Sequence, residues 1–184
     1  FNRGSIFYGA AFNDDVSFSD VTFGDTASFN GVTVAGDADF SWAQFTQGGE
    51  FRDAEFGHVD FTEADVTETN FTGVDLRNAD FESALLSRAT LFDADLRGAK
   101  LSGAVLGDMR INEATQFLGH HTAATDNSDH SFAAIRSRQC CVYDPTYEAD
   151  NESADVDKAK SVYRALEELA GKASRPRLQS RCFV

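Results

Sequence analysis

Large apolar residues recur at every fifth position through the middle of the chain, and they are Phe51, Phe56, Phe61, Val66, Phe71, Leu76, Phe81, Leu86, Leu91, Leu96, Leu101, Leu106 and Ile111. The residue two positions before each of them, from Ala54 to Ala104, is small or β-branched. The residue in between is often Asp or Asn, as in Ala79-Asp80-Phe81. A period of five matches neither the 3.6-residue period of an α-helix nor the two-residue period of a flat strand.

The earlier part of the chain carries the same signal with a different spacing. Its large residues are Phe1, Phe7, Phe12, Phe18, Phe23, Phe29, Val34, Phe40, Phe45 and Phe51, so that steps of six and five alternate. The extra residue predicts a bulge at alternate corners, which leaves the inward positions in register.

Such a repeat indicates a chain that turns a corner every five residues, so that four units make one square coil. The large residue and the small one before it face inward, and successive coils pair at about 4.8 Å, as neighbouring strands do. Stacking would place Phe51, Phe71, Leu91 and Ile111 in one column. The predicted structural core contains Phe51, Phe56, Phe61, Phe71, Leu76, Phe81, Leu86, Leu91, Leu96 and Leu101.

The unit small–acidic–large–polar–polar resembles the Ala-(Asp/Asn)-Leu-x-x unit of the pentapeptide-repeat family, over about residues 1–118. The resemblance implies an all-β solenoid, the right-handed quadrilateral β-helix. The Phe-rich, acidic front resembles haloarchaeal members in particular. Because Phe1 is already in phase with the repeat, we expect the chain to be a fragment or its first coil to be covered by a partner.

The repeat ends after Phe117, and two further segments are expected. Residues 119–152 are predicted to be a loop and an irregular connector. Residues 153–184 are predicted to be an α-helical appendage, with an amphipathic helix over about 153–171 followed by a basic tail. Its apolar face carries Val162, Tyr163, Leu166 and Leu169, which we expect to cap the last coil or, alternatively, to form a dimer interface.

The charge is strongly negative and unevenly distributed. The formal net charge is −14, with 20 acidic and 7 basic residues in 1–118 and 10 and 9 in the remainder. This balance excludes the basic footprint of a nucleic-acid binder, so no direct nucleic-acid binding is expected. The simplest explanation of the negative net charge is adaptation to high salt, because net charge acts first on solubility.

No stretch is apolar and long enough to span a bilayer, so a membrane would be reached only through parts outside this chain. Three cysteines, two of them adjacent, do not form a disulfide framework. A reducing cytoplasm fits this pattern best.

Two sets of residues carry candidate chemistry. Metal ligands by type are His120, His121, His130, Cys140, Cys141 and Cys182, but their spacing matches no zinc signature. The recurring acids are Asp60, Asp65, Asp75, Asp80 and Asp95. These acids recur because the unit recurs, on a convex surface without a pocket, so they are expected to form an interaction surface rather than a catalytic pair. The sequence therefore predicts no catalytic residue, no metal and no cofactor, and not an enzyme.

Three functions remain open. The first is a non-catalytic scaffold whose faces bind a protein partner of unknown identity, since solenoids present extended surfaces. The second, implied by the resemblance, is a DNA-mimicking inhibitor of gyrase or topoisomerase; Arg52, Arg77, Arg88, Arg97 and Arg110 interrupt its acidic faces. The third is a soluble segment of a membrane-associated assembly. A homo-oligomer through an end of the rod or the C-terminal helix is also compatible with the pattern.

Overall fold

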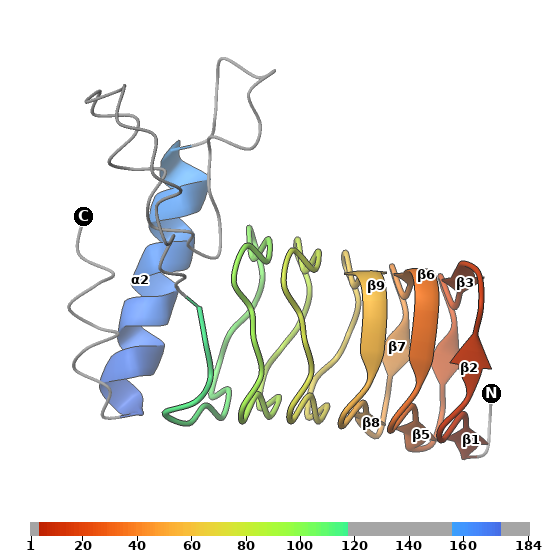
Figure 1. The fold of residues 1–184 in the computed structure, drawn as a ribbon. Coiled ribbons are helices and arrows are strands. Elements are labelled where there is room, and N and C mark those ends of the chain that lie inside the picture. The colour runs from red at the N-terminus through yellow and green to blue at the C-terminus, as the bar shows by residue number, and fades with distance from the viewer. Residues whose placement is uncertain (1–3, 118–155, 174–184) are drawn as a thin grey trace, which may run out of the picture.

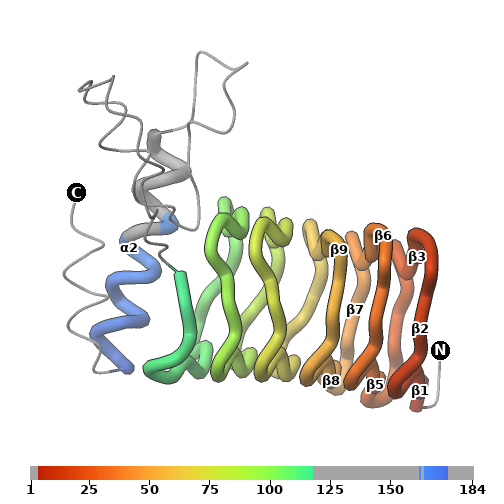
Figure 2. The backbone as a smooth tube through the Cα atoms, viewed as in Figure 1, coloured from red at the N-terminus to blue at the C-terminus, as the bar shows by residue number. Residues whose placement is uncertain are grey.

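The computed structural model describes residues 4–117 and 156–173, which form a rod of stacked coils with one helix across an end (Figure 1). The predicted connector and the basic tail therefore lie outside the described residues, whereas the predicted helix lies largely within them. In Figure 2 the backbone winds around the rod axis coil after coil from the N-terminal end. This is the four-sided β-helix that the five-residue period predicts.

All paired strands of the rod are parallel, and most of them are only two residues long because each spans one side of a coil. They are β1 (Ser5–Ile6), β2 (Ala11–Phe12), β3 (Val16–Ser17), β4 (Thr22–Phe23), β5 (Ala27–Ser28), β6 (Thr33–Asp39), β7 (Gln44–Phe45), β8 (Gly49–Glu50) and β9 (Glu55–Asp60). They pair in the orders β1-β5-β8, β4-β7 and β2-β6-β3, with β9 on β6. Beyond β9 the same sides continue as single parallel bridges, such as Asp75 with Asp95.

The coil shortens from 22 to 20 residues in two steps. Ser5 pairs with Ala27, and Val34 with Phe56, which are both steps of 22. The register between β6 and β9 then shifts, so that Asp37 pairs with His58, a step of 21. Glu50 pairs with Asn70, and from there each step is 20 as far as the pair Thr90 and Arg110, after which Asp95 pairs with Gln116, a step of 21. The two extra residues of the early coils thus sit at alternate corners, as the alternating spacing predicts.

The corners are β-turns whose third residue has a positive φ. At one corner the Ala54 N–H donates to the Phe51 carbonyl at 3.0 Å, and Asp53 between them has a φ of 56°. Gly73 occupies the same turn position one coil later, with a φ of 75°. Asp, Asn and Gly are the residues that tolerate this conformation best, which explains their frequency at the corners.

Inward rings stack in columns along the rod. Phe40, Phe61 and Phe81 form one column with successive centroid distances of 5.1 Å and interplanar angles of 14° and 10°. Of the predicted core, these side chains are almost completely buried: Phe51, Phe61, Phe71, Leu76, Phe81, Leu86, Leu91, Leu96 and Leu101. One coil therefore presents the next with a flat apolar layer of matching shape.

Phe56 departs from the predicted core because it is only half-buried. Its neighbour one coil earlier is Val34, so it has no ring to stack on there. The nearest rings, those of Phe40 and Phe51, are 6.4 Å away and not parallel to it. Phe56 also lies at the corner where the coil loses a residue, and Gly57 beside it has no side chain to cover the ring.

Helix α2 (Val156–Lys172) lies across the end of the rod formed by the last coil (Figure 1). Val162, Leu166 and Leu169 are buried in the same apolar cluster as the rod interior. The apolar face of α2 is therefore used within the chain, as a cap would use it. The side chain of Tyr163, which the sequence places on this face, lies outside the described part.

Candidate functional site

The outward residues that precede each large one form ladders along the rod, because each pairs with its counterpart in the next coil. The Asp60 ladder is Ser17, Asp39, Asp60, Asp80 and Lys100. The Asp65 ladder is Thr22, Gln44, Asp65, Leu85 and Val105. The Asp75 ladder is Asp75, Asp95 and Gln116. The five acids expected to form one surface therefore lie on three sides of the rod, with only Asp60–Asp80 and Asp75–Asp95 as neighbours.

Each of these carboxylates also closes the turn that follows it. Backbone N–H groups two residues ahead donate to Asp60 at 2.7 Å, to Asp65 at 3.1 Å and to Asp80 at 3.0 Å. Asp75 and Asp95 accept the same bond, each at 3.1 Å. This side-chain turn is typical of Asp and Asn. The acids at these five positions thus contribute to the fold, whatever else they bind.

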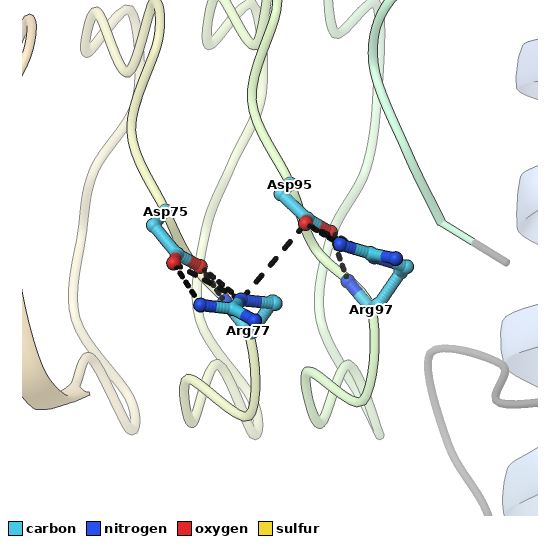
Figure 3. Close-up of polar contacts among 4 residues, drawn as sticks. All are labelled: Asp75, Arg77, Asp95 and Arg97. Carbon is cyan, nitrogen blue, oxygen red and sulfur yellow. Dashed lines mark hydrogen bonds and ion pairs between the residues drawn. The ribbon is translucent and has the colours of Figure 1, made fainter. Parts of the chain in front are cut away.

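Arginines on the rear coils neutralise the acids of the Asp75 ladder (Figure 3). Arg77 Nη2 lies 2.5 Å from Asp75 Oδ2, and Arg77 Nε lies 3.9 Å from Asp95 Oδ2 in the next coil. Arg97 forms an ion pair with Asp95 in the same manner. The four side chains form an alternating chain of charges along the rod, which leaves little net charge on this side.

These contacts shift the acid–base equilibria of the groups involved. Hydrogen bonds from the Arg77 side chain hold the pKa of Asp75 below its ordinary value against the opposing effect of burial. The same hydrogen bonds raise the pKa of Arg77. The pKa of Arg97 is raised likewise by hydrogen bonding to Asp95. These shifts keep Asp75, Arg77 and Arg97 charged at neutral pH.

Two further ion pairs cross between coils. Lys100 Nζ lies 2.7 Å from Asp80 Oδ2, and Arg88 Nη2 lies 2.5 Å from Glu68 Oε1. Burial raises the pKa of Asp80, but hydrogen bonds from Lys100 and from the Glu82 N–H outweigh it, so that the pKa lies below its ordinary value. The arginines that seem in the sequence to interrupt acidic faces are therefore largely partners of those acids.

The front of the rod has a different charge balance from the rear. Residues 4–68, the front half, contain 13 Asp and Glu against one basic residue, Arg52, apart from His58. Residues 69–117, the rear half, contain 7 Asp and Glu against 5 Lys and Arg. Among the described residues, every cation of an ion pair lies in the rear half or on α2. The uncompensated negative charge is thus concentrated on the front half.

Hydroxyl groups rather than cations organise the front-half carboxylate of Asp39. Ser41 donates to its Oδ1 through the backbone N–H at 2.9 Å and the hydroxyl at 2.6 Å, and Ser17 donates to Oδ2 at 3.1 Å. Burial raises the pKa of Asp39, yet these hydrogen bonds bring it below the ordinary value. Asp39 therefore keeps its charge without a cation.

Exposed apolar side chains break the polar ladders at a few positions. Leu85 and Val105 are neighbours in the Asp65 ladder and are 41% and 46% exposed. Trp42, which the sequence places at an outward position, is 54% exposed. Ile6 and Tyr8 are exposed on the first coil. Sequence reasoning missed Leu85 and Val105, although an apolar residue where the repeat has Asp or Asn is a signal that finds them.

The described residues offer little for catalysis or for a metal. No group of three or more His, Cys, Asp or Glu side chains in residues 4–117 and 156–173 is placed to hold a metal ion. The six His and Cys residues considered as ligands lie outside these ranges. A hollow of about 380 Å³ between the last coil and α2 is lined largely by apolar side chains, including Phe92, Met109, Ile111 and Leu169. In the part of the chain described here, no helix has the length and apolar character needed to cross a membrane.

Comparison with known proteins agrees with this geometry. Two family models described as pentapeptide repeats match the chain, one over residues 18–65 and the other over residues 50–88 and 69–108. Together with the observed coils, these matches support placing the repeat region in the pentapeptide-repeat family. The sequence matches no curated protein.

Several solved structures are also similar. Rfr23, a pentapeptide repeat protein from the cyanobacterium Cyanothece 51142, is 18% identical with a TM-score of 0.45, covering 61% of this chain and 87% of that one. HetL, involved in heterocyst differentiation regulation in Nostoc sp. strain PCC 7120, is 18% identical with a TM-score of 0.31, covering 52% and 41%. A trypsin-treated variant of QnrB1, a plasmid-mediated fluoroquinolone resistance protein, is 15% identical with a TM-score of 0.33, covering 64% and 75%. At these TM-scores, none of the likenesses bears on function.

Proposed function

We propose that this protein is a non-catalytic interaction scaffold whose front half binds a basic surface of a protein partner in the cytoplasm. The observation that carries the proposal is the uneven compensation of charge: 13 acidic residues face one Lys or Arg in residues 4–68, whereas the rear half is nearly balanced. General salt adaptation requires acidity but does not require it at one end. A concentrated patch of one sign favours association with a surface of the opposite sign.

The scaffold provides what such a surface needs. The carboxylates of the front half stand on coils that are hydrogen-bonded to one another, for example by the Phe40 N–H, which donates to the Asp60 carbonyl at 2.7 Å. The charges are therefore held in place before a partner arrives, which lowers the entropic cost of binding. The cytoplasmic location is part of the proposal and rests on the pattern of cysteines.

The test compares two variants with equal charge loss. The front variant is Asp14→Asn, Asp20→Asn and Glu63→Gln; the rear variant is Asp93→Asn, Asp108→Asn and Glu113→Gln, and all six residues are exposed. Binding of a labelled oligolysine peptide of about ten residues is measured by fluorescence anisotropy at low salt. We expect the front variant to raise Kd about 5- to 30-fold, at roughly 0.3–0.7 kcal/mol for each exposed charge, and the rear variant about twofold. Equal effects of the two variants would show that the acidity is general solvation.

A DNA-mimicking inhibitor of gyrase or topoisomerase is the second candidate, because the front half reaches the charge density of a duplex. Duplex DNA carries one charge per about 1.7 Å, or about three per 4.8 Å coil. The front half has an excess of 12 acids over Lys and Arg, which is about four for each of its roughly three coils. The rear half has an excess of only two, so the matching region is about 14 Å long, or roughly four base pairs.

A supercoiling assay with gyrase separates this candidate from the first. Stoichiometric inhibition that weakens with added salt, and that the front variant abolishes while the rear variant does not, would favour the mimic. No inhibition at any protein concentration would leave the scaffold.

A further inference from the structure

The tryptophan at position 42 stands in an unusual backbone position on the acidic half of the rod. It is the third residue of a turn, with a φ of 62°. Of the described non-glycine residues with positive φ, it is the only aromatic one; the others are Asp20, Asp53, Glu63, Glu68, Asn78, Ser83, Arg88, Asp93 and Asp108. A bulky side chain in this region costs about 1–2 kcal/mol, and such outliers gather where a side chain is presented for function.

Acidic residues occupy the turn position of Trp42 in the coil before it and in the coil after it. The turns of Asp20, Trp42 and Glu63 are stacked, since the Asp20 N–H donates to the Ser41 carbonyl and the Trp42 N–H to the Thr62 carbonyl, both at 2.9 Å. The residues that precede Asp20 and Trp42 also join the two turns, because the Ser19 and Ser41 hydroxyls lie 2.9 Å apart in a hydrogen bond. Trp42 is thus an exposed ring on a rigid support between two acids.

A strip of exposed apolar groups runs on from this corner. The turn of Trp42 opens the side of the coil whose outward residue is Gln44, a member of the Asp65 ladder. Along that ladder Leu85 lies two coils beyond Gln44, and Val105 follows in the next coil, with Asp65 in between. We call Trp42, Leu85 and Val105, together with the acids Asp20, Glu63 and Asp65, the Trp42 strip. At about 4.8 Å for each coil, its apolar members span about 14 Å.

We propose that the Trp42 strip is the docking site for a cationic amphipathic α-helix of the protein partner; this rests on the function proposed above and names the chemistry of its ligand. A helix of about ten residues rises 15 Å and carries apolar anchors and Lys or Arg side chains on one side. Its anchors cover Trp42, Leu85 and Val105, and its cations meet Asp20, Glu63 and Asp65. Tryptophan is enriched among the residues that dominate binding energy in such interfaces.

A strand cannot bind there by extending the sheet, which favours the helix. Along this side, the N–H groups of Asp65, Leu85 and Val105 donate to carbonyls of the preceding coil at 2.8–2.9 Å. The carbonyls of the same three residues accept from the N–H groups of Phe45, Val66 and Leu86 at 2.9–3.0 Å. The segments at Asp65 and Leu85 are thus bonded to the coils before and after them, so at these positions a partner must dock through side chains.

The experiment uses the chain's single tryptophan as a reporter. An amphipathic Leu/Lys peptide of about 14 residues is added, and the emission of Trp42 is followed; the same peptide with a fluorescein label gives Kd by anisotropy. We expect a blue shift on binding, because the exposed indole becomes covered. Trp42→Asn, which keeps a residue suited to positive φ, should raise Kd about tenfold or more, and Leu85→Ser about fivefold.

Matched controls come from the first coil, where Ile6 and Tyr8 are even more exposed, at 79% and 74%. Ile6→Ser and Tyr8→Ser should change Kd by less than about twofold, and a Leu/Glu peptide should not bind.

Absence of a blue shift, or equal effects of Ile6→Ser and Leu85→Ser, would overturn the proposed site. If oligolysine binds as strongly as the Leu/Lys peptide and Trp42→Asn has no effect, the docking site fails while the proposed function stands. If neither cationic peptide binds at low salt, the proposed function itself fails.

Discussion

The aspartate before each large residue has two separable properties at the residue scale, its turn-closing oxygen and its charge. The sequence shows that this position is acidic or Asn, and Asn70 indeed accepts the same bond from Thr72 N–H, at 3.1 Å. The oxygen closes the turn whether or not it carries a charge. Asp75 and Asp95 gain a cation from the arginine two residues ahead. The cation of Asp80 comes from Lys100 one coil away, so this pair could not be derived from the repeat unit alone.

The charge of Asp80 contributes to stability through Lys100. Its pKa is lowered on folding, so this stability is present above the ordinary carboxyl pKa and is lost as the pH falls through the folded value. We expect Asp80→Asn to cost about 1 kcal/mol at pH 7, with the difference from wild type shrinking below about pH 4. Urea unfolding at pH 7 and pH 3 measures it. Asp65→Asn, which keeps the turn acceptor and removes no ion pair seen in the structure, should be nearly neutral; an equal cost for both variants would contradict this account.

Inward rings should differ in their contribution according to burial. Phe81 is fully buried in a ring column, whereas Phe56 is half-buried without a parallel neighbour. We expect Phe81→Ala to cost about 3–5 kcal/mol and Phe56→Ala about 2 kcal/mol or less. Chemical denaturation of both variants compares them. Phe81→Ala with wild-type stability would refute the inward assignment, and equal losses would refute the distinction between the two positions.

At the scale of the structural element, the rod is built from coils, and the number of residues in a coil changes at particular corners. The alternating spacing in the sequence predicts that early coils are longer and that alternate corners are wider. The register shift between Val34 and Asp37 shows where the first extra residue is lost. The sequence does not reveal the close approach that accompanies it, because that contact joins residues 21 positions apart.

Gly57 makes this approach, and its substitution tests it. A Cβ on Gly57 would lie 2.8 Å from the Gly36 carbonyl oxygen and 3.0 Å from that of Ala35, both backbone atoms that move only with the coil. We expect Gly57→Ala to cost about 1–3 kcal/mol by overpacking. Gly107→Ala is the control, since its Cβ would meet only the Ser87 hydroxyl, at 3.5 Å. Thermal unfolding of both variants is the measurement; a neutral Gly57→Ala would mean that the coils separate readily at this corner.

The C-terminal helix shows the limit of prediction at this scale. Its 3.6-residue periodicity predicts a helix over 153–171, close to the observed Val156–Lys172. The choice between a cap and a dimer interface was open, because nothing in the repeat fixes what packs on its last coil. The burial of Leu166 and Leu169 against the rod interior comes from the tertiary structure alone.

For the whole molecule, the repeat explains the fold almost completely, since one inward–outward rule applies to every unit. The distribution of charge is less predictable. Five arginines interrupt acidic faces in the sequence, but Arg77, Arg88 and Arg97 form ion pairs with acids in the structure. The result is a rod with a balanced rear and a strongly negative front.

Repulsion within the front half predicts a salt dependence of stability. Added salt screens exposed like charges, so the free energy of unfolding should rise with KCl concentration and fall at low salt. Urea unfolding at about 0.05 M and 1 M KCl tests this. The front variant described above should show a weaker dependence than the rear variant, because it removes uncompensated charges. A flat dependence in the wild type would count against halophilic adaptation.

The stepwise shortening of the coil has a mechanical consequence. A chain pulled from its ends in a force spectrometer would release one coil at a time, because each coil is bonded only to its neighbours. A released coil of 22 residues extends to about 73–79 Å and one of 20 residues to about 66–72 Å. Two increments of contour length, differing by about 7 Å, would then report how far from the helix-capped end the rupture has advanced.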